Sequence, residues 1–126
     1  MKRDMELIRK ILFAIEASDC EPLDWIELKI DGYSDSLVSY HVQLLSEAGL
    51  VDAIDSSTMG NYEVNPRRLT WHGHEFLDTV RDPGVWHKTE AEVVKLGDFG
   101  FDMLRALAKG YLKKKIEEHT DIKLEF

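Results

Sequence analysis

Positive charge is scarce in the middle of this 126-residue chain. Residues 21–66 contain one basic side chain, Lys29, and nine acidic ones. Basic and acidic side chains balance in residues 1–20, 67–83 and 84–126, so the net charge of −8 lies entirely in this one segment. Proteins that bind nucleic acid through its phosphates normally use several lysines and arginines. Residues 21–66 alone are therefore poorly suited to attract nucleic acid.

Cysteine and long apolar runs are also scarce. A single cysteine, Cys20, excludes an internal disulfide framework and favours a reducing cytoplasm. No apolar run is long enough to cross a bilayer, so we expect no membrane partner. The opening residues, MKRDMELIRK, mix charged and aliphatic side chains, which predicts the start of a helix and not a signal peptide. The sequence predicts a cytoplasmic protein with one small domain and an appendage.

The residues that support catalysis or metal binding lack the necessary spacing. His72 and His74 would point about 200° apart on a helix, whereas zinc-binding pairs usually lie four residues apart. None of the serines lies in a nucleophile-elbow motif, and the glycines near the C-terminus are too scattered for a phosphate-binding loop. We expect no enzyme, no metal site and no cofactor.

The clearest pattern covers residues 34–69. Six residues share one face of a helix expected over 34–48, namely Leu37, Val38, His41, Leu44, Leu45 and Ala48. Gly49 should end this helix, and residues 50–54, 55–61 and 62–64 predict a strand, a polar turn and a returning strand. His41 should be a core histidine with one hydrogen bond. A helix followed by such a hairpin is typical of the recognition helix and wing of a winged helix-turn-helix fold.

Upstream of this pattern we expect a helix over residues 5–17 and a strand over residues 23–30. Asp4 should cap the helix, whose core residues would be Met5, Ile8, Ile11, Leu12 and Ile15. After Pro22, side chains alternate, with Ile26, Leu28 and Ile30 on one face and Trp25, Glu27 and Lys29 on the other. A strand is predicted here where many winged helices have a second helix. Ser34 or Asp35 would cap the following helix.

Downstream of the hairpin the sequence predicts three more helices. Thr70 should cap a helix over 71–81, anchored by Trp71, Phe76, Leu77 and Val80. The Asp82-Pro83-Gly84 turn separates a winged-helix domain, residues 1–82, from a helical extension, residues 83–126. Helices are expected over 89–96 and 101–118, and the last has an apolar stripe of Phe101, Leu104, Leu107, Ala108, Tyr111 and Leu112. This stripe should pack on the first helix or form a homodimer, and residues 121–126 should be a short strand or disordered. The predicted fold class is α+β, mainly α, with a two- to three-stranded wing sheet.

Several sequence words resemble a known family. MKRDMELIRKIL, SYHVQLLSEAGLV, RRLTWHGHEFLD and VW followed by KT are similar to an uncharacterised winged-helix family found in bacterial and phage-derived genomes, a domain of unknown function. The resemblance covers nearly the whole chain, and the word LTW.GHEFLD is its most specific part. It implies a fold and a mobile-element setting, and it supplies no activity or functional residues.

Two binding functions fit this fold. The first is a DNA-binding regulator of prophage origin, in which Ser36, Ser39 and Gln43 read base edges and Arg67 and Arg68 hold phosphates. The arginines could equally neutralise the acidic segment ahead of them. The second is a protein-interaction winged helix that uses its acidic face on a basic partner. The fold favours the first function, and the local charge favours the second.

Overall fold

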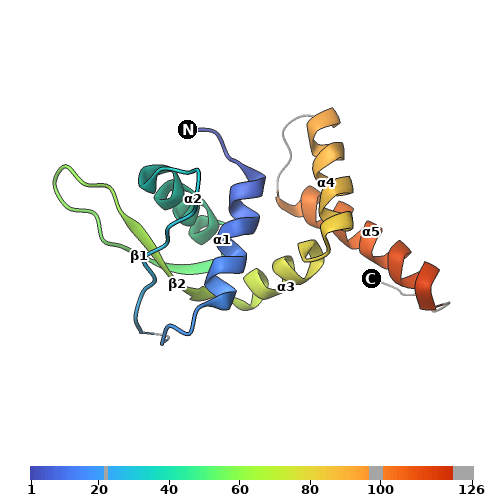
Figure 1. Cartoon of the computed structure of the whole chain (residues 1–126), viewed down its shortest axis with the longest axis horizontal. Helices are drawn as coiled ribbons and strands as arrows, with labels where there is room; N and C mark the ends of the chain where they lie inside the picture. Colours follow the sequence, from blue (N-terminus) through green and yellow to red (C-terminus); the bar gives the residue numbers. More distant parts are fainter. Residues whose placement is uncertain (22, 97–100, 121–126) are drawn as a thin grey trace. The chain divides into compact units, whose positions relative to one another are not determined.

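A computed structural model describes residues 1–21, 23–96 and 101–120. In the last two helices it leaves out the side chains of residues 93–96, 101–105, 107–108 and 119–120. The described residues form an α+β fold, mainly helical, with five helices and a two-stranded antiparallel sheet (Figure 1). The chain divides into two compact units, Met1–Leu77 and Asp78–Phe126. The predicted division at residue 82 stays a prediction.

The first helix, α1, spans Met5–Ala17, as predicted. The Leu7 amide donates to the Asp4 carboxylate at 3.1 Å, which confirms Asp4 as the N-cap. Its buried residues are Leu7, Ile8, Ile11, Leu12 and Ile15. Met5, which we predicted in the core, is only half-buried. Leu7, which we did not predict there, is buried instead.

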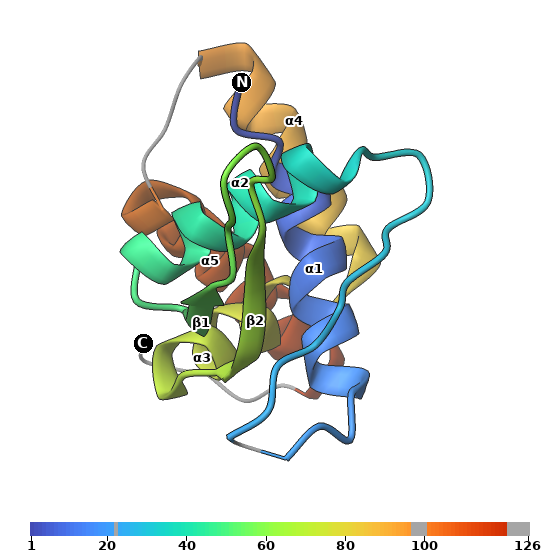
Figure 2. The same ribbon diagram turned by 90° about the vertical axis from the view of Figure 1, so that its left-hand side faces the viewer.

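The second helix, α2, spans Asp35–Glu47, and Ser34 caps it by accepting the Leu37 amide at 3.2 Å. Its buried residues are Val38, Ser39, His41, Val42 and Leu45. The expectation that Ser39 reaches base edges from an outward face is therefore wrong, and Ala48 is exposed where we expected it in the core. The reason is tertiary: α2 packs against α1 and also against both strands, which widens its buried arc toward Ser39 (Figure 2).

The sheet pairs β1, Val51–Asp55, with β2, Val64–Leu69. A left-handed Gly49, with φ of 77°, separates α2 from β1 as predicted. A bulge falls between Asp52 and Ala53, which pair with Arg68 and Pro66, so Arg67 has no partner across the sheet. The returning strand thus begins two residues later than expected and extends further.

The strand predicted over residues 23–30 is not part of this sheet. Its alternation is real, because Ile26, Leu28 and Ile30 are half-buried while the residues between them are exposed. A backbone hydrogen bond joins this segment to β2, from the Ile26 amide to the Pro66 carbonyl at 2.8 Å. Pro66 has no N–H to return, so the ladder that would make a third strand cannot form at this position.

Helix α3 spans Trp71–Val80 and starts at Thr70, whose hydroxyl accepts the Gly73 amide at 3.1 Å. Phe76, Leu77 and Val80 are buried as predicted, but Trp71 is 77% exposed. Gly73 is the residue on the packed face, since a Cβ built there would lie 2.0 Å from the Leu50 carbonyl oxygen. Trp71 is two residues away from Gly73 and so points to nearly the opposite side of the helix.

The second unit contains α4, Pro83–Leu96, and α5, Phe101–Thr120, which pack on each other. Helix α4 begins six residues earlier than predicted, because Asp82 is its cap and proline is well suited to a first helical position. Of the apolar stripe predicted on α5, the side chains of Phe101, Leu104, Leu107 and Ala108 lie outside the described residues. The Tyr111 ring is half-buried, with Lys88 Nζ 5.8 Å from its centroid. Residues 121–126 also lie outside the described part.

Asp82 joins the two helices of the second unit, and this contact should depend on pH. Its carboxylate accepts from Lys115 Nζ at 2.5 Å and from the Val85 amide at 3.0 Å. The hydrogen bond from Lys115 is the largest cause that holds the pKa of Asp82 below its ordinary value, and the hydrogen bond from the Val85 amide acts in the same direction. A lowered carboxyl pKa adds stability above the unfolded pKa of about 3.9, and this stability is lost as pH falls through the folded pKa.

We therefore expect Asp82→Asn to weaken the second unit at neutral pH and to flatten its acid-unfolding curve. Circular dichroism of the full chain between about pH 6 and pH 2 measures both effects. Asp78→Asn is the matched control, because among the described residues its exposed carboxylate pairs only with Arg81 in the next turn, at 3.1 Å. Identical acid transitions for the Asp82→Asn chain and the wild type would contradict the assignment.

Candidate binding face on α2 and the hairpin

A polar pocket of about 190 Å³ lies beside α2 in the first unit. Its lining comes from residues 27–29, from the first turns of α2 and from residues 61–65 of the hairpin. Its lining residues are Glu27, Leu28, Lys29, Asp35, Val38, Ser39, Asn61, Tyr62, Glu63, Val64 and Asn65. The sequence analysis missed Tyr62, Glu63 and Asn65, and a polar asparagine inside a strand pattern was the available signal.

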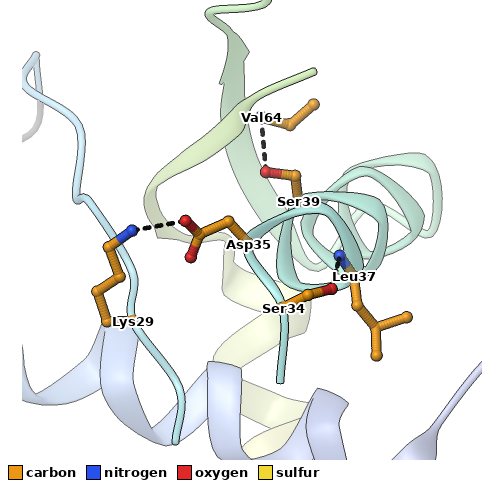
Figure 3. Close-up of polar contacts among 6 residues, drawn as sticks. All are labelled: Lys29, Ser34, Asp35, Leu37, Ser39 and Val64. Atoms are coloured by element: carbon orange, nitrogen blue, oxygen red, sulfur yellow. Dashed lines mark hydrogen bonds and ion pairs between the residues drawn. The ribbon is translucent and has the colours of Figure 1, made fainter. Parts of the chain in front are cut away.

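Carboxylates dominate the charge of this pocket. Glu27, Asp35 and Glu63 line it, and Lys29 is the only basic residue among its lining side chains. Lys29 Nζ donates to Asp35 Oδ2 at 2.8 Å (Figure 3). This hydrogen bond and the Asp35 charge raise the pKa of Lys29, and Glu27 and Glu63 add smaller contributions in the same direction. The pocket therefore has a negative potential that already holds one cation of the chain.

Two further acids extend the negative region around Tyr62. Burial raises the pKa of the Tyr62 phenol, and the charges of Asp55 and Glu47 raise it further. We call the set Glu27, Asp35, Glu47, Asp55 and Glu63 the acidic face.

The residues predicted to read DNA bases occupy different environments. Ser36 and Gln43 are exposed on α2, but Ser39 is 6% exposed and its hydroxyl accepts the Val64 amide at 3.1 Å (Figure 3). Gln43 accepts the Tyr62 hydroxyl with its amide oxygen and donates to Glu47 at 3.4 Å. Ser39 thus fastens α2 to the sheet edge, and Gln43 fastens α2 to the hairpin.

The two arginines predicted to hold phosphates lie on β2 and do not line the pocket. Arg67 is half-buried at the bulge, and its Nε is buried without a hydrogen-bond partner in the described part of the chain. Arg68 is exposed, with Nη1 donating to the Leu69 carbonyl at 3.3 Å and Nε 3.9 Å from the Asp52 carboxylate. That distance is at the limit of an ion pair, so Arg68 neutralises little of the acidic segment.

His41 is a core residue that supports the packing of α1 on α2. It is fully buried, and its Nε2 accepts the Asp4 backbone amide at 2.8 Å. Nδ1 must then carry the proton and donate to the Leu37 carbonyl at 2.9 Å, which fixes one neutral tautomer. The prediction of a core histidine is confirmed, with two hydrogen bonds in place of one. His41 ties the start of α1 to α2.

Other chemistry finds little support in the described residues. Across residues 1–21, 23–96 and 101–120, no three His, Cys, Asp or Glu side chains gather in a way that could hold a metal ion. No helix in the same ranges is long and apolar enough to cross a membrane.

Comparison with known proteins places the chain in a family. The family described as "Hypothetical protein (DUF2513)" matches residues 2–98. An "Uncharacterized protein" of Haemophilus influenzae (strain ATCC 51907 / DSM 11121 / KW20 / Rd) is 33% identical over 117 residues, which cover 92% of this chain and 99% of that relative. No solved structure matches the chain significantly. This protein therefore belongs to the DUF2513 family.

Proposed function

We propose that this chain is a non-enzymatic binding module of the winged-helix type whose acidic face binds a basic segment of a protein partner. The observation that carries the proposal is the charge of the surface formed by α2 and the hairpin. Lys29, the one basic residue among those lining the pocket, is paired with Asp35 within the chain, whereas Glu27 and Glu63 have no ion pair with any described residue.

The winged-helix assignment is supported by the order and packing of the elements. Helix α2 leads through Gly49 into the β1–β2 hairpin, and both pack together as a recognition helix and its wing do. The extended residues 23–30 replace the helix that usually precedes the recognition helix. A winged helix can bind either DNA or protein, so the ligand must be argued from the surface.

Charge favours a protein ligand over duplex DNA. Binding to duplex DNA draws most of its strength from contacts between cations and phosphates, and the exposed surface of α2 offers carboxylates from Asp35 and Glu47 instead. The same potential attracts a cationic segment, raises its association rate and rejects polyanions.

A capture experiment with charge variants tests the proposal. We expect the immobilised chain to retain basic proteins from nuclease-treated lysate, and a triple variant, Glu47→Gln, Asp55→Asn and Glu63→Gln, to lose most of them. The matched control, Asp19→Asn, Glu90→Gln and Glu118→Gln, removes three charges outside the acidic face and should retain the same proteins. Equal retention by the two triple variants, or retention only without nuclease, would contradict a protein partner.

A second candidate, duplex DNA, is favoured by one observation. Arg68 is exposed on β2, next to the half-buried Arg67, so a positive charge is available at the base of the hairpin. These arginines would contact backbone phosphates while Ser36 and Gln43 face base edges; Ser39 is too buried to join them. With so few cations the salt slope would be shallow, corresponding to about two to four phosphates. A homodimer through α5, a cytoplasmic location and a prophage origin likewise remain proposals.

A further inference from the structure

We infer that the pocket beside α2 receives one arginine side chain of the basic partner. The inference rests on the proposed function and adds the group that the partner must present. Four features of the pocket carry it: its charge, its volume, the apolar part of its lining and the environment of Asn65.

The pocket has acceptors that the chain itself does not use. Asp35 is taken by Lys29, but the carboxylates of Glu27 and Glu63 line the pocket without an ion pair to any described residue. Carboxylates bind a planar guanidinium well because two of its N–H groups can be donated side by side. An anion would meet three carboxylates and one neutralised ammonium, so the site disfavours it.

Asn65 is the second, independent feature that points to a polar ligand. It is only 6% exposed and lines the pocket, yet its side-chain amide makes no hydrogen bond to another residue of the described chain. Its polar atoms are not among the fully enclosed, unpaired atoms of the described residues, so they remain accessible from the pocket that Asn65 lines. The amide oxygen of Asn65 can accept an N–H of an incoming guanidinium, which would satisfy it.

The size and the apolar lining also fit arginine. A volume of about 190 Å³ equals roughly six water molecules at about 30 Å³ each, too large for a bare ion and sufficient for a guanidinium with part of its stem. Leu28, Val38 and Val64 supply the apolar part of the lining. Arginine methylenes commonly lie along such surface while the charged head meets polar groups.

Titration of the full chain with Nα-acetyl-arginine amide, followed by NMR, tests the inference. We expect saturable shifts of the Asn65 side-chain amide and the Val64 backbone amide at millimolar probe. Nα-acetyl-lysine amide should bind several-fold more weakly, because its ammonium cannot reach several acceptors at once. Glu63→Gln should weaken arginine binding about three- to tenfold, whereas Asp52→Asn, which removes an acid outside the pocket, should leave it unchanged.

Two results would overturn the arginine site. One is the absence of shifts at Asn65 and Val64; the other is equal binding by the wild type and the Glu63→Gln chain. Binding of an arginine-rich peptide to the full chain tests the proposed function separately. If the peptide binds in a way that depends on Glu47 and Asp55 but causes no shifts at Asn65 and Val64, only the arginine site is refuted. Loss of peptide binding altogether would refute the acidic face as the partner surface.

Discussion

Gly73→Ala is expected to destabilise the first unit by about 2–3 kcal/mol, although alanine is the better helix former. The new Cβ would lie 2.0 Å from the carbonyl oxygen and 3.0 Å from the carbonyl carbon of Leu50. Both atoms belong to the backbone between α2 and β1, so no side chain can rotate away to make room. Helix α3 or the start of β1 must shift, and the contacts of Phe76 and Leu77 with the core would loosen.

Urea unfolding of the full chain, followed by circular dichroism and by NMR signals of the first unit, measures this loss. Gly110→Ala is the matched control, because outside the helix's own neighbouring backbone no described atom lies within 4 Å of the Cβ that it would add to α5. That substitution should stabilise the second unit by up to about 1 kcal/mol. If Gly73→Ala were neutral or stabilising, the close approach of α3 to Leu50 would be wrong.

The second large effect concerns His41. His41→Ala should cost about 3–5 kcal/mol, since it removes a fully buried ring as well as its hydrogen bonds. His41→Leu keeps most of the side-chain volume and so isolates the contribution of the hydrogen bonds. It removes the acceptor for the Asp4 amide and the donor to the Leu37 carbonyl, which should cost about 1–3 kcal/mol. His72→Leu, at an exposed position of α3, is the control and should change stability little.

Chemical denaturation of the three histidine variants separates packing from hydrogen bonding at this position. Amide exchange adds a local measurement: the first turn of α1 should exchange faster in His41→Leu, because the cap residue Asp4 loses its contact with α2. A His41→Leu chain as stable as the wild type, with unchanged exchange in α1, would show that the ring is held by packing alone.

Local signals in the sequence predicted the helices well. Asp4 and Thr70 each cap a helix as predicted, and Ser34, one of two predicted candidates, caps α2, because a cap depends on a side chain and an amide three residues apart. Gly49 ended α2 for an equally local reason. Pro83 was misread as part of a break, although proline also starts helices.

The surface was harder to predict because tertiary packing determines it. The helical wheel alone could not show that β2 would lie beside Ser39, which turned a supposed base contact into a support for the sheet edge. Alternation in residues 23–30 correctly predicted which side chains are half-buried, but strand pairing also depends on Pro66 in a distant segment. The pocket is lined by three separate segments, residues 27–29, 35–39 and 61–65, so no single stretch of sequence contains it.

The charge distribution was the most informative feature before and after folding. Nine acids against one lysine in residues 21–66 could have been dispersed over many surfaces. In the structure, Glu27, Asp35 and Glu63 meet at one pocket, and Glu47 and Asp55 act on Tyr62 at its edge. The same negative potential that would repel a phosphate backbone makes this face suitable for a cationic protein segment.

The most direct test compares the two ligands in one fluorescence-anisotropy series from about 50 to 200 mM salt. The probes are a labelled arginine-rich peptide and labelled duplexes of random and selected sequence, titrated with the wild type, the acidic-face triple variant and Arg67→Ala/Arg68→Ala. We predict that the peptide binds at low salt, that the acidic-face variant weakens it about tenfold or more, and that no duplex binds even at 50 mM. Duplex binding at 50 mM that is lost in Arg67→Ala/Arg68→Ala, with no binding of the peptide, would contradict a protein-binding acidic face and establish the DNA function instead.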